Sequence, residues 1–518
     1  MRFVLPSLLG ALAGCAAVPK EAGPEETASG GSDDSGPIDS GEDDTAPEPV
    51  TRVLSSANLT FDGVNVGDRA GRYVAAAGDV DGDGRPDLYF GSDQGDSGKS
   101  ELPGRVYVVP ASSLPSSGTV ELGEASHVYM GEEHGDMAGH SGGHAGDMDG
   151  DGYGEVVISA YHVSDGGAEQ GRIYILRGGA RPEPGVTLLA DADWTFGGAA
   201  DYGRLGHGLA GVGDVDGDGL DDVLVGECCG EPARLGAAWM VLGGALGATG
   251  FTEVMDVYPR WDGAALGDGA GVKTAAAGDV DGDGLADALV SARLSMGVMP
   301  GGRVYLLPGS AVQAGAADEL AALGQQFEGV ETYGELGYSI GAAGDVDGDG
   351  LGDLLMGAYH ASSRAPNSGV VYLFLARDLT GTSVYADTAW LQLTSSVENQ
   401  QAGVSVTGDM NVDGDSLADF VIGASGVSPP TLEGSSTDTE NMDSPGDAYL
   451  FLGARLEGGV VDVKTATVHV QGETTNDHAG ISVANPGDID GDGADDLLVG
   501  GERGQEGVGR AWLLYGLY

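Results

Sequence analysis

Basic side chains, long apolar runs and catalytic motifs are all scarce in this 518-residue sequence. Only 23 Lys and Arg stand against 81 Asp and Glu, which gives a formal net charge of −58. A surface this negative repels phosphate backbones and anionic headgroups, so nucleic acid is excluded as a natural partner. After the first residues no apolar run approaches the length of a membrane span. No serine elbow, zincin motif or phosphate loop is present, so we identify no catalytic residue and expect a protein that is not an enzyme.

Glycine, by contrast, is abundant. The chain has 95 Gly and 21 Pro, a proportion that also occurs in collagen-like and disordered chains. Glycine does not recur at every third residue, however, and 41% of the chain is hydrophobic and lies in short, regularly spaced runs. The composition therefore predicts a folded chain, with one large all-β domain or several ordinary ones.

The N-terminus has the pattern of an export signal in residues 1–14, with a basic start, a short apolar stretch and small residues before Cys15. Residues 12–15 resemble a bacterial lipobox, which implies cleavage before Cys15 and lipidation of that cysteine. Ala16 follows where an inner-membrane retention signal has Asp, so the resemblance implies an outer-membrane lipoprotein on the cell-surface or periplasmic face. Residues 15–52 are rich in Gly, Ser, Pro, Asp and Glu, which predicts an acidic, flexible tether.

A nine-residue acidic motif recurs seven times, starting at residues 79, 147, 214, 279, 345, 411 and 488. A glycine lies eight residues before each start, and a small residue lies twelve residues after it. Each unit offers four short strands, and four strands per unit in a tandem array are typical of propeller blades. We therefore predict that residues 53–518 form an all-β, seven-bladed β-propeller with four-stranded blades. The strand expected near residues 54–62 would complete the last blade and leave no open edge.

The repeated motif, Asp-x-Asp-x-Asp-Gly-x-x-Asp, directs carboxylates from positions one, three, five and nine, and the carbonyl of position seven, toward one centre. Hard cations such as Ca²⁺ prefer about six to eight oxygen ligands, and glycine permits the sharp turn. We predict up to seven Ca²⁺ ions, one per blade, in the loops between first and second strands. The predicted ligands are, loop by loop, Asp79, Asp81, Asp83, Arg85 and Asp87; Asp147, Asp149, Asp151, Tyr153 and Glu155; Asp214, Asp216, Asp218, Leu220 and Asp222; Asp279, Asp281, Asp283, Leu285 and Asp287; Asp345, Asp347, Asp349, Leu351 and Asp353; Asn411, Asp413, Asp415, Leu417 and Asp419; and Asp488, Asp490, Asp492, Ala494 and Asp496. The sixth loop should bind most weakly, because Asn411 replaces an acid and Ser416 replaces the glycine.

The units resemble FG-GAP repeats of the integrin α-subunit β-propeller. Ala70 and Leu336 stand where the first motif of that family usually has Phe, whereas the second motif survives, for example as Gly-Ala-Tyr at residues 357–359. The resemblance implies a calcium-loaded extracellular module that is used for adhesion. We therefore expect a surface-anchored binding module with a protein or glycan ligand, held at the membrane by its lipid alone.

Two further readings stay open at this point. A calcium-dependent polysaccharide lyase or hydrolase would need a cluster of Arg, Lys, His or Tyr in one mouth of the propeller, and a purely structural envelope protein would need no ligand. Adjacent Cys228 and Cys229 could form a disulfide or remain two thiols. Ligand contacts are expected on the variable loops opposite the calcium loops. The candidates are Glu132, His134, Tyr202, Trp261, Tyr333 and Glu335.

Overall fold

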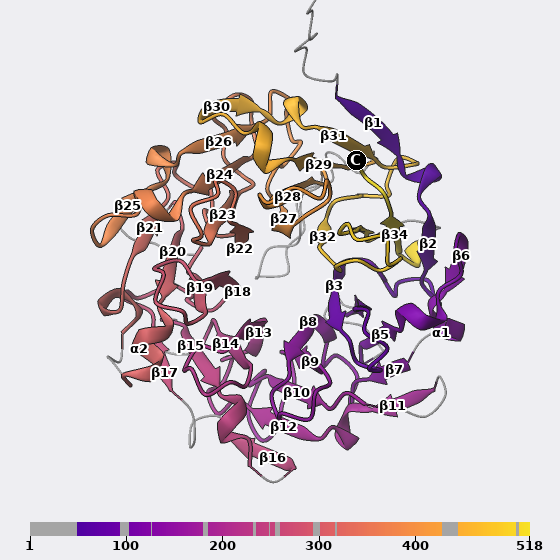
Figure 1. Ribbon diagram of the computed structural model, residues 1–518. Coiled ribbons are helices and arrows are strands. Elements are labelled where there is room, and N and C mark those ends of the chain that lie inside the picture. The colour runs from indigo at the N-terminus through magenta and orange to yellow at the C-terminus, as the bar shows by residue number, and fades with distance from the viewer. Residues whose placement is uncertain are drawn as a thin grey trace, which may run out of the picture. The chain divides into compact units, whose positions relative to one another are not determined.

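Short strands separated by glycine-rich turns make up the fold. They form seven sheets around a central axis, which confirms the seven-bladed β-propeller (Figure 1). The computed structural model describes residues 49–93, 103–125, 127–179, 185–230, 235–247, 249–253, 259–293, 301–315, 319–426, 444–503 and 507–518. The export signal, Cys15 and most of the tether lie outside these residues, as do parts of the variable loops.

Each blade begins with an inner strand, and the seven inner strands surround the axis (Figure 1). They are β3 (Tyr73–Gly78), β8 (Ala138–Gly146), β13 (Leu205–Gly213), β18 (Lys273–Gly278), β22 (Ser339–Gly344), β27 (Ser405–Met410) and β32 (Ser482–Ala484). The second strands are β4 (Asp87–Ser92), β9 (Glu155–Ala160), β14 (Asp222–Glu227), β19 (Asp287–Ser291), β23 (Asp353–Ala358), β28 (Asp419–Ala424) and β33 (Leu497–Gly501).

Two more antiparallel strands follow outward in each blade. The third strands are β5 (Arg105–Val109), β10 (Arg172–Leu176), β15 (Ala237–Val241), β20 (Arg303–Leu307), β24 (Val370–Phe374), β29 (Asp447–Phe451) and β34 (Arg510–Leu514). The fourth strands are β7 (His127–Met130), β12 (Trp194–Gly197), β17 (Arg260–Asp262), β21 (Gln326–Glu328), β26 (Leu391–Thr394), β31 (Val468–Gln471) and β2 (Leu59–Asp62).

The ring closes through the N-terminal strand, as the sequence predicts. Strand β2 pairs antiparallel with β34, and Leu59 lies opposite Leu513. Asp62 accepts two hydrogen bonds from the Arg510 guanidinium, at 2.6 and 2.9 Å. Blade seven is therefore built from both ends of the chain.

The prediction of four strands per blade was incomplete, because six of the sheets have a fifth strand. Each fifth strand precedes the fourth strand of one blade and pairs in parallel with the fourth strand of the preceding blade. These lacing strands are β1 (Val50–Val53), β6 (Gly118–Glu121), β11 (Val186–Leu188), β16 (Gly250–Glu253), β25 (Ser383–Tyr385) and β30 (Gly459–Asp462). In the remaining sheet a single parallel bridge joins Asp262 to Glu319. Strand β1 lies partly within the segment that the sequence assigned to the tether.

Helical elements are short connectors. Those described are α1 (Leu122–Ala125), α2 (Gly309–Gln313), η1 (Leu54–Ser56), η2 (Ala111–Ser113), η3 (Leu189–Asp191), η4 (Gly243–Ala245), η6 (Leu320–Ala322), η7 (Ala376–Asp378), η8 (Ala386–Thr388), η9 (Gly453–Arg455) and η10 (Val463–Thr465). In the part of the chain that the structure describes, no helix is both long and apolar enough to cross a membrane.

The hydrophobic core is divided among the interfaces between neighbouring blades. One cluster joins blades three and four and contains Trp261 and Tyr305, which are 1% and 0% exposed. Another joins blades seven and one, where the Phe61 and Phe90 rings lie 4.7 Å apart. Packing of this kind holds the axis rigid and leaves the loops at both ends free for function.

Candidate metal centres and ligand face

The acidic motifs lie between the first and second strands of the blades, all at the same end of the axis. In the first loop Asp79 Oδ1 accepts hydrogen bonds from the amides of Gly82 and Asp83, at 2.7 and 3.0 Å. Asp79 Oδ2 accepts from the amide of Gly84, at 2.9 Å. Gly82 and Gly84 have φ of 76° and 86°, in the left-handed region where glycine is favoured. The sequence thus folds the loop tightly around its first carboxylate.

The acid at position nine begins the second strand and is buried. Asp87 accepts hydrogen bonds from the amides of Val80, at 3.0 Å, and Ala111, at 2.8 Å, so it ties the loop to the end of β5. Burial, together with the charges of Asp81 and Asp83, raises the pKa of Asp87 to about 7 against the lowering effect of the two hydrogen bonds. Burial likewise raises the pKa of its equivalents, to about 7 for Glu155, Asp222 and Asp353, about 6 for Asp287 and Asp419, and about 8 for Asp496.

The donor set of these loops fits a hard cation. Carboxylate oxygens of Asp79, Asp81 and Asp87 lie within 4.8 Å of one another, and four further groups of this kind are Asp147, Asp149 and Glu155; Asp214, Asp216 and Asp218; Asp279, Asp281 and Asp287; and Asp345, Asp347 and Asp353. Asp149 Oδ1 is buried and has no hydrogen-bond partner among the described residues. A Ca²⁺ ion prefers oxygen ligands of this type. It would relieve the repulsion between the carboxylates and give the unpaired oxygen of Asp149 a partner.

The sixth loop differs in the way its sequence suggests. Asn411 Oδ1 accepts a hydrogen bond from the Gly414 amide at 2.8 Å, as the first carboxylate does in other loops. Its Nδ2 donates to the Asp415 carbonyl at 2.9 Å. An amide nitrogen therefore stands where the other loops have a second oxygen, and it cannot ligate a cation.

We expect Asp349→Ala to destabilise the protein more than Asp415→Ala when Ca²⁺ is present. The two residues hold the same loop position, and their Oδ1 atoms accept from Leu351 and Leu417 amides at 3.0 and 2.7 Å. Both variants lose the hydrogen bond that closes this turn, so the difference between their stabilities reports the loss of the bound ion. Loss of one site costs about 2.7 kcal/mol at about a hundredfold excess of Ca²⁺ over its dissociation constant.

Chemical denaturation with Ca²⁺ and with EDTA measures this difference. The two variants should unfold with similar free energies in EDTA and diverge in Ca²⁺. Equal losses in Ca²⁺, or a greater loss for Asp415→Ala, would contradict the ranking of the loops.

Neighbouring loops are joined by backbone hydrogen bonds around the axis. The position-eight amide of each loop donates to the position-one carbonyl of the preceding loop, as Gly352 does to Asp279 at 2.9 Å. Bonds of this type join six successive pairs, from Gly154 with Asp79 to Asp495 with Asn411. Blade one has Pro86 at position eight, which has no amide hydrogen to donate. The chain of bonds is therefore interrupted where blade seven meets blade one.

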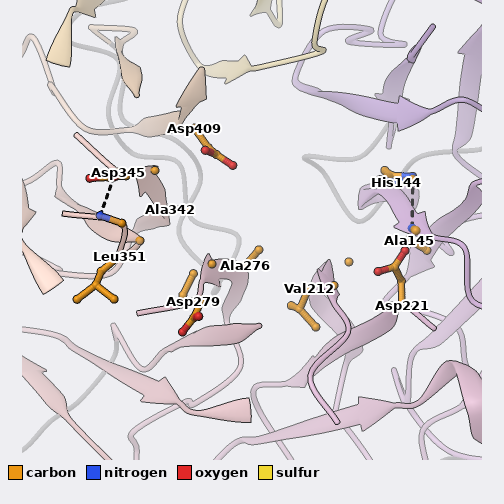
Figure 2. Close-up of a pocket in the computed structure, with 18 residues that line it drawn as sticks. His144, Ala145, Val212, Asp221, Ala276, Asp279, Ala342, Asp345, Leu351 and Asp409 are labelled. Carbon is orange, nitrogen blue, oxygen red and sulfur yellow. Dashed lines mark hydrogen bonds between the residues drawn. The ribbon is translucent and has the colours of Figure 1, made fainter. Parts of the chain in front are cut away.

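A cavity of about 450 Å³ opens at this end of the axis (Figure 2). Asp221, Asp279, Asp345 and Asp409 contribute carboxylates to its lining, and His144 also lines it. Asp221 Oδ2 accepts a hydrogen bond from the Asp147 amide at 2.8 Å, so part of this lining belongs to the joined loops. The cavity is strongly acidic and shares the loop end with the candidate metal centres.

The ligand candidates on the opposite face differ in their exposure and their contacts. Tyr333 and Tyr202 are exposed, at 71% and 45%, and His134 is also exposed. Glu132 is exposed too, and it accepts hydrogen bonds from the Arg172 guanidinium at 2.7 Å and from the Tyr174 hydroxyl at 2.8 Å.

Trp261 was wrongly placed among surface contacts, because it is only 1% exposed and packs in the core as part of β17. Its aromatic ring fills the interface between blades three and four and cannot reach a ligand. Glu335 belongs to a different environment, since it forms an ion pair with Arg293 at 2.5 Å.

Sequence reasoning missed a cluster of polar and aromatic side chains around the axis at the end opposite the acidic loops. Its members stand six or seven residues before the motif starts, or fourteen residues after them. We call this set the axial cluster: Arg72, Asp93, His140, Tyr161, His207, Lys273, Arg293, Tyr338 and Tyr359. The glycine eight residues before each motif and the small residue twelve after it mark these registers, which was the available signal.

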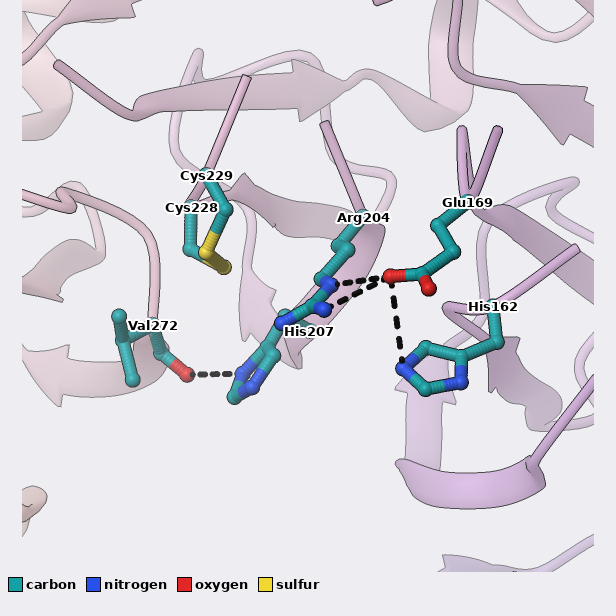
Figure 3. The surroundings of a disulfide bond; sticks show 7 residues. All are labelled: His162, Glu169, Arg204, His207, Cys228, Cys229 and Val272. Atoms are coloured by element: carbon teal, nitrogen blue, oxygen red, sulfur yellow. Dashed lines mark hydrogen bonds and ion pairs between the residues drawn. A yellow bond between two sulfur atoms is a disulfide. The ribbon is translucent and has the colours of Figure 1, made fainter. Parts of the chain in front are cut away.

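Cys228 and Cys229 form a disulfide, the first of the two alternatives that the sequence left open. Cys228 holds in blade three the register position that Tyr161 holds in blade two. Figure 3 shows the disulfide together with His207, whose Nδ1 donates to the Val272 carbonyl at 3.0 Å. Cys228 therefore occupies a repeat position that in blade two belongs to the axial cluster.

These features define an all-β, seven-bladed propeller with repeated acidic loops. Three segments match the FG-GAP repeat, at residues 71–109, 138–176 and 336–374, so the chain carries FG-GAP repeats. It is similar to integrin alpha-PS2 of Drosophila melanogaster, with 28% identity over 243 residues, 43% of this chain and 15% of that protein. It is also similar to integrin alpha-5 of Xenopus laevis, with 31% identity over 156 residues, 29% of this chain and 14% of that protein.

Integrin alpha-IIb of Homo sapiens is 28% identical over 253 residues, 46% of this chain and 22% of that protein. The chain thus spans less than a quarter of the length of these integrin relatives. Among solved structures, the V. cholerae biofilm matrix protein Bap1 aligns with a TM-score of 0.26 and 13% identity, over 86% of this chain and 80% of that chain.

Proposed function

We propose that this protein is a calcium-loaded propeller that binds a ligand at the bacterial cell surface, anchored through lipid on Cys15. The observation that carries the proposal is the convergence of carboxylates in the repeated loops, with Asp79, Asp81 and Asp87 as an example. Similarity to integrin α-subunits supports an adhesion or ligand-binding role. When bound, Ca²⁺ supplies positive charge that neutralises the loops and fixes their conformation.

The two ends of the propeller have separate tasks in this proposal. The acidic residues would hold ions at the loop end and stiffen the ring. The opposite end carries the variable connections between blades, and loops on a rigid scaffold are where recognition concentrates. Tyr202 and Tyr333 are exposed there and have φ of 57° and 63°, so the backbone holds them in a defined turn.

A glycan and protein array probed with and without EDTA tests this function. We expect a ligand that binds in Ca²⁺ and is lost in EDTA, and weaker binding by the Tyr333→Ala and Tyr202→Ala variants with no change in calcium-dependent melting. Tyr385→Ala is the matched control, because Tyr385 is 56% exposed but lies on lacing strand β25. Binding that survives both substitutions, and is lost instead on changing exposed residues beside the acidic loops, would place the ligand on the wrong face for this proposal.

The second candidate is a calcium-dependent polysaccharide lyase or hydrolase, and the axial cluster favours it. The cluster brings together the Arg, Lys, His and Tyr side chains that such an enzyme requires. His140 Nδ1 lies 3.2 Å from Asp93 Oδ2, and burial lowers the pKa of His140, against the effect of Asp93. A neutral histidine oriented by a carboxylate is a suitable general base. Product analysis of acidic polysaccharides incubated with the protein separates this candidate from a binding module.

A further inference from the structure

The axial cluster concentrates cations in a chain that has few of them. Arg72 comes from blade one, and Lys273 and Arg293 come from blade four. Lys273 Nζ lies 6.0 Å from the centre of the Tyr73 ring of blade one, so side chains from non-adjacent blades meet at the axis. Three of only 23 basic residues therefore converge at the end opposite the acidic loops.

Two of these three cations already have carboxylate partners. Arg72 Nη1 lies 3.6 Å from Asp93 Oδ2, and Arg293 Nη1 lies 2.5 Å from Glu335 Oε2. Within the described ranges no carboxylate lies at ion-pair distance from Lys273 Nζ, and Lys273 keeps partial solvent exposure. Burial, together with the like charges of Arg293 and Arg72, lowers the pKa of Lys273 to about 8. An incoming anion would supply the counter-charge that this ammonium lacks.

Besides Tyr73, whose ring lies beside this ammonium, the axial cluster contains pairs of rings on other blades. The His140 ring lies 4.3 Å from the Tyr161 ring and 5.0 Å from the His207 ring. On blade five the Tyr338 and Tyr359 rings lie 4.0 Å apart. Aromatic faces beside polar ring edges are typical of sites that bind small polar ligands, because one surface packs and the other forms hydrogen bonds.

Burial lowers the pKa of both histidines of the cluster, which favours their neutral form, and His207 is only 4% exposed. Burial lowers the pKa of His207 well below its ordinary value, and the nearby charges of His140 and Lys273 add to this. Because Nδ1 of His207 donates to the Val272 carbonyl, its Nε2 is an acceptor in the neutral ring. Neutral hydrogen-bond acceptors and donors around one ammonium suit the hydroxyl groups of a sugar ring. They suit a peptide ligand with several acidic side chains less well.

The charge of the whole protein limits the ligand to few carboxylates. The ammonium of Lys273 can balance one anionic group, and the net charge of −58 repels further ones. We propose that the axial cluster binds a glycan with a single carboxylate on its terminal sugar, with Lys273 as counter-ion and the partly exposed rings of His140 and Tyr338 as packing surfaces. This rests on the proposed binding function and names the chemistry of its ligand.

Calorimetric titration of the full chain in Ca²⁺ tests the proposal with three probes. These are a disaccharide ending in glucuronate, its methyl ester, and the matching disaccharide ending in glucose. We expect the acid to bind about tenfold tighter than either neutral probe. Lys273→Met should remove that preference, whereas Lys273→Arg should keep it. Lys464→Met, in exposed η10, is the matched control and should bind as the parent does.

The comparison of acid and ester on the unaltered protein needs no variant and stands even if Lys273→Met fails to fold. Equal binding of acid and ester, no binding of any probe, or a preserved preference in a folded Lys273→Met variant would overturn the proposal. The calcium-dependent melting temperature is recorded alongside. If melting responds to Ca²⁺ and an array finds only ligands without a carboxylate, the binding function stands and this inference alone is wrong.

Discussion

Removing Ca²⁺ is expected to lower the melting temperature of the propeller on the order of 15 degrees. A ligand that binds only the native state stabilises it by about 2.7 kcal/mol per site at about a hundredfold excess over the dissociation constant. Six loops carry four acids each, so the sum is about 16 kcal/mol. An unfolding entropy of about 2.1 cal/mol/K per residue gives about 1 kcal/mol/K for residues 48–518, which sets the size of the shift.

Differential scanning calorimetry in EDTA and in millimolar Ca²⁺ measures this effect, and metal analysis of the dialysed protein counts the bound ions. Mg²⁺ at equal concentration is the control for ionic strength, since its stricter geometry and smaller size suit these loops less well. An unchanged melting temperature together with no bound metal would show that the acidic loops are only solvated turns.

The fold could be predicted because its signals are local and repeated. Each acidic motif fixes the turn between two strands, and seven copies in register leave little freedom for the strand order. Closure by β2 followed from the same register, because the chain ends after a third strand and begins with a fourth. Loop six could be singled out from Asn411 and Ser416 alone, since a ligand's chemistry is visible in its side chain.

The lacing strands could not be predicted from the sequence, because they are short and do not show the alternation of buried and exposed residues that identifies a strand. Strand β11 is three residues long, with Val186 and Leu188 exposed at 63% and 49%. Such strands form because a neighbouring blade offers an unpaired edge, and that edge exists only in the assembled ring. Trp261 was misjudged for a related reason, since its burial depends on blade four packing against blade three.

The axial cluster lay beyond sequence reasoning because its members belong to different blades. Arg72 and Lys273 are 201 positions apart in the sequence, and they approach each other only after the ring has closed. Scattered basic residues in the sequence therefore become a concentrated site in the structure. Asp68 and Asp268, eleven residues before their motifs, were also missed, although each bonds a tyrosine of its own repeat unit. Both are fully buried and accept hydrogen bonds from the Tyr107 and Tyr305 hydroxyls, at 3.4 and 2.7 Å.

Removal of the closing strand is expected to abolish cooperative unfolding, and a nested series of N-terminal deletions locates the effect. A chain that lacks residues 17–47 should melt as the parent does, because the propeller unit begins at residue 48. A chain that lacks residues 17–53 loses β1, which adds a parallel edge strand to blade six through pairs such as Val50 with Val468. We expect a small fall in melting temperature, since this strand is mostly exposed.

A chain that lacks residues 17–62 also loses β2, the fourth strand of blade seven. The fully buried Leu59 and Phe61 leave the core cluster, and Arg510 loses both hydrogen bonds to Asp62. The exposed edge of β34 would then be open to pairing with other chains. We expect aggregation and a broad transition, measured by light scattering and calorimetry in Ca²⁺. A gradual loss in proportion to deletion length, or a cooperative transition that survives the longest deletion, would contradict closure by β2, because only the step from residue 53 to residue 62 removes the strand that completes blade seven.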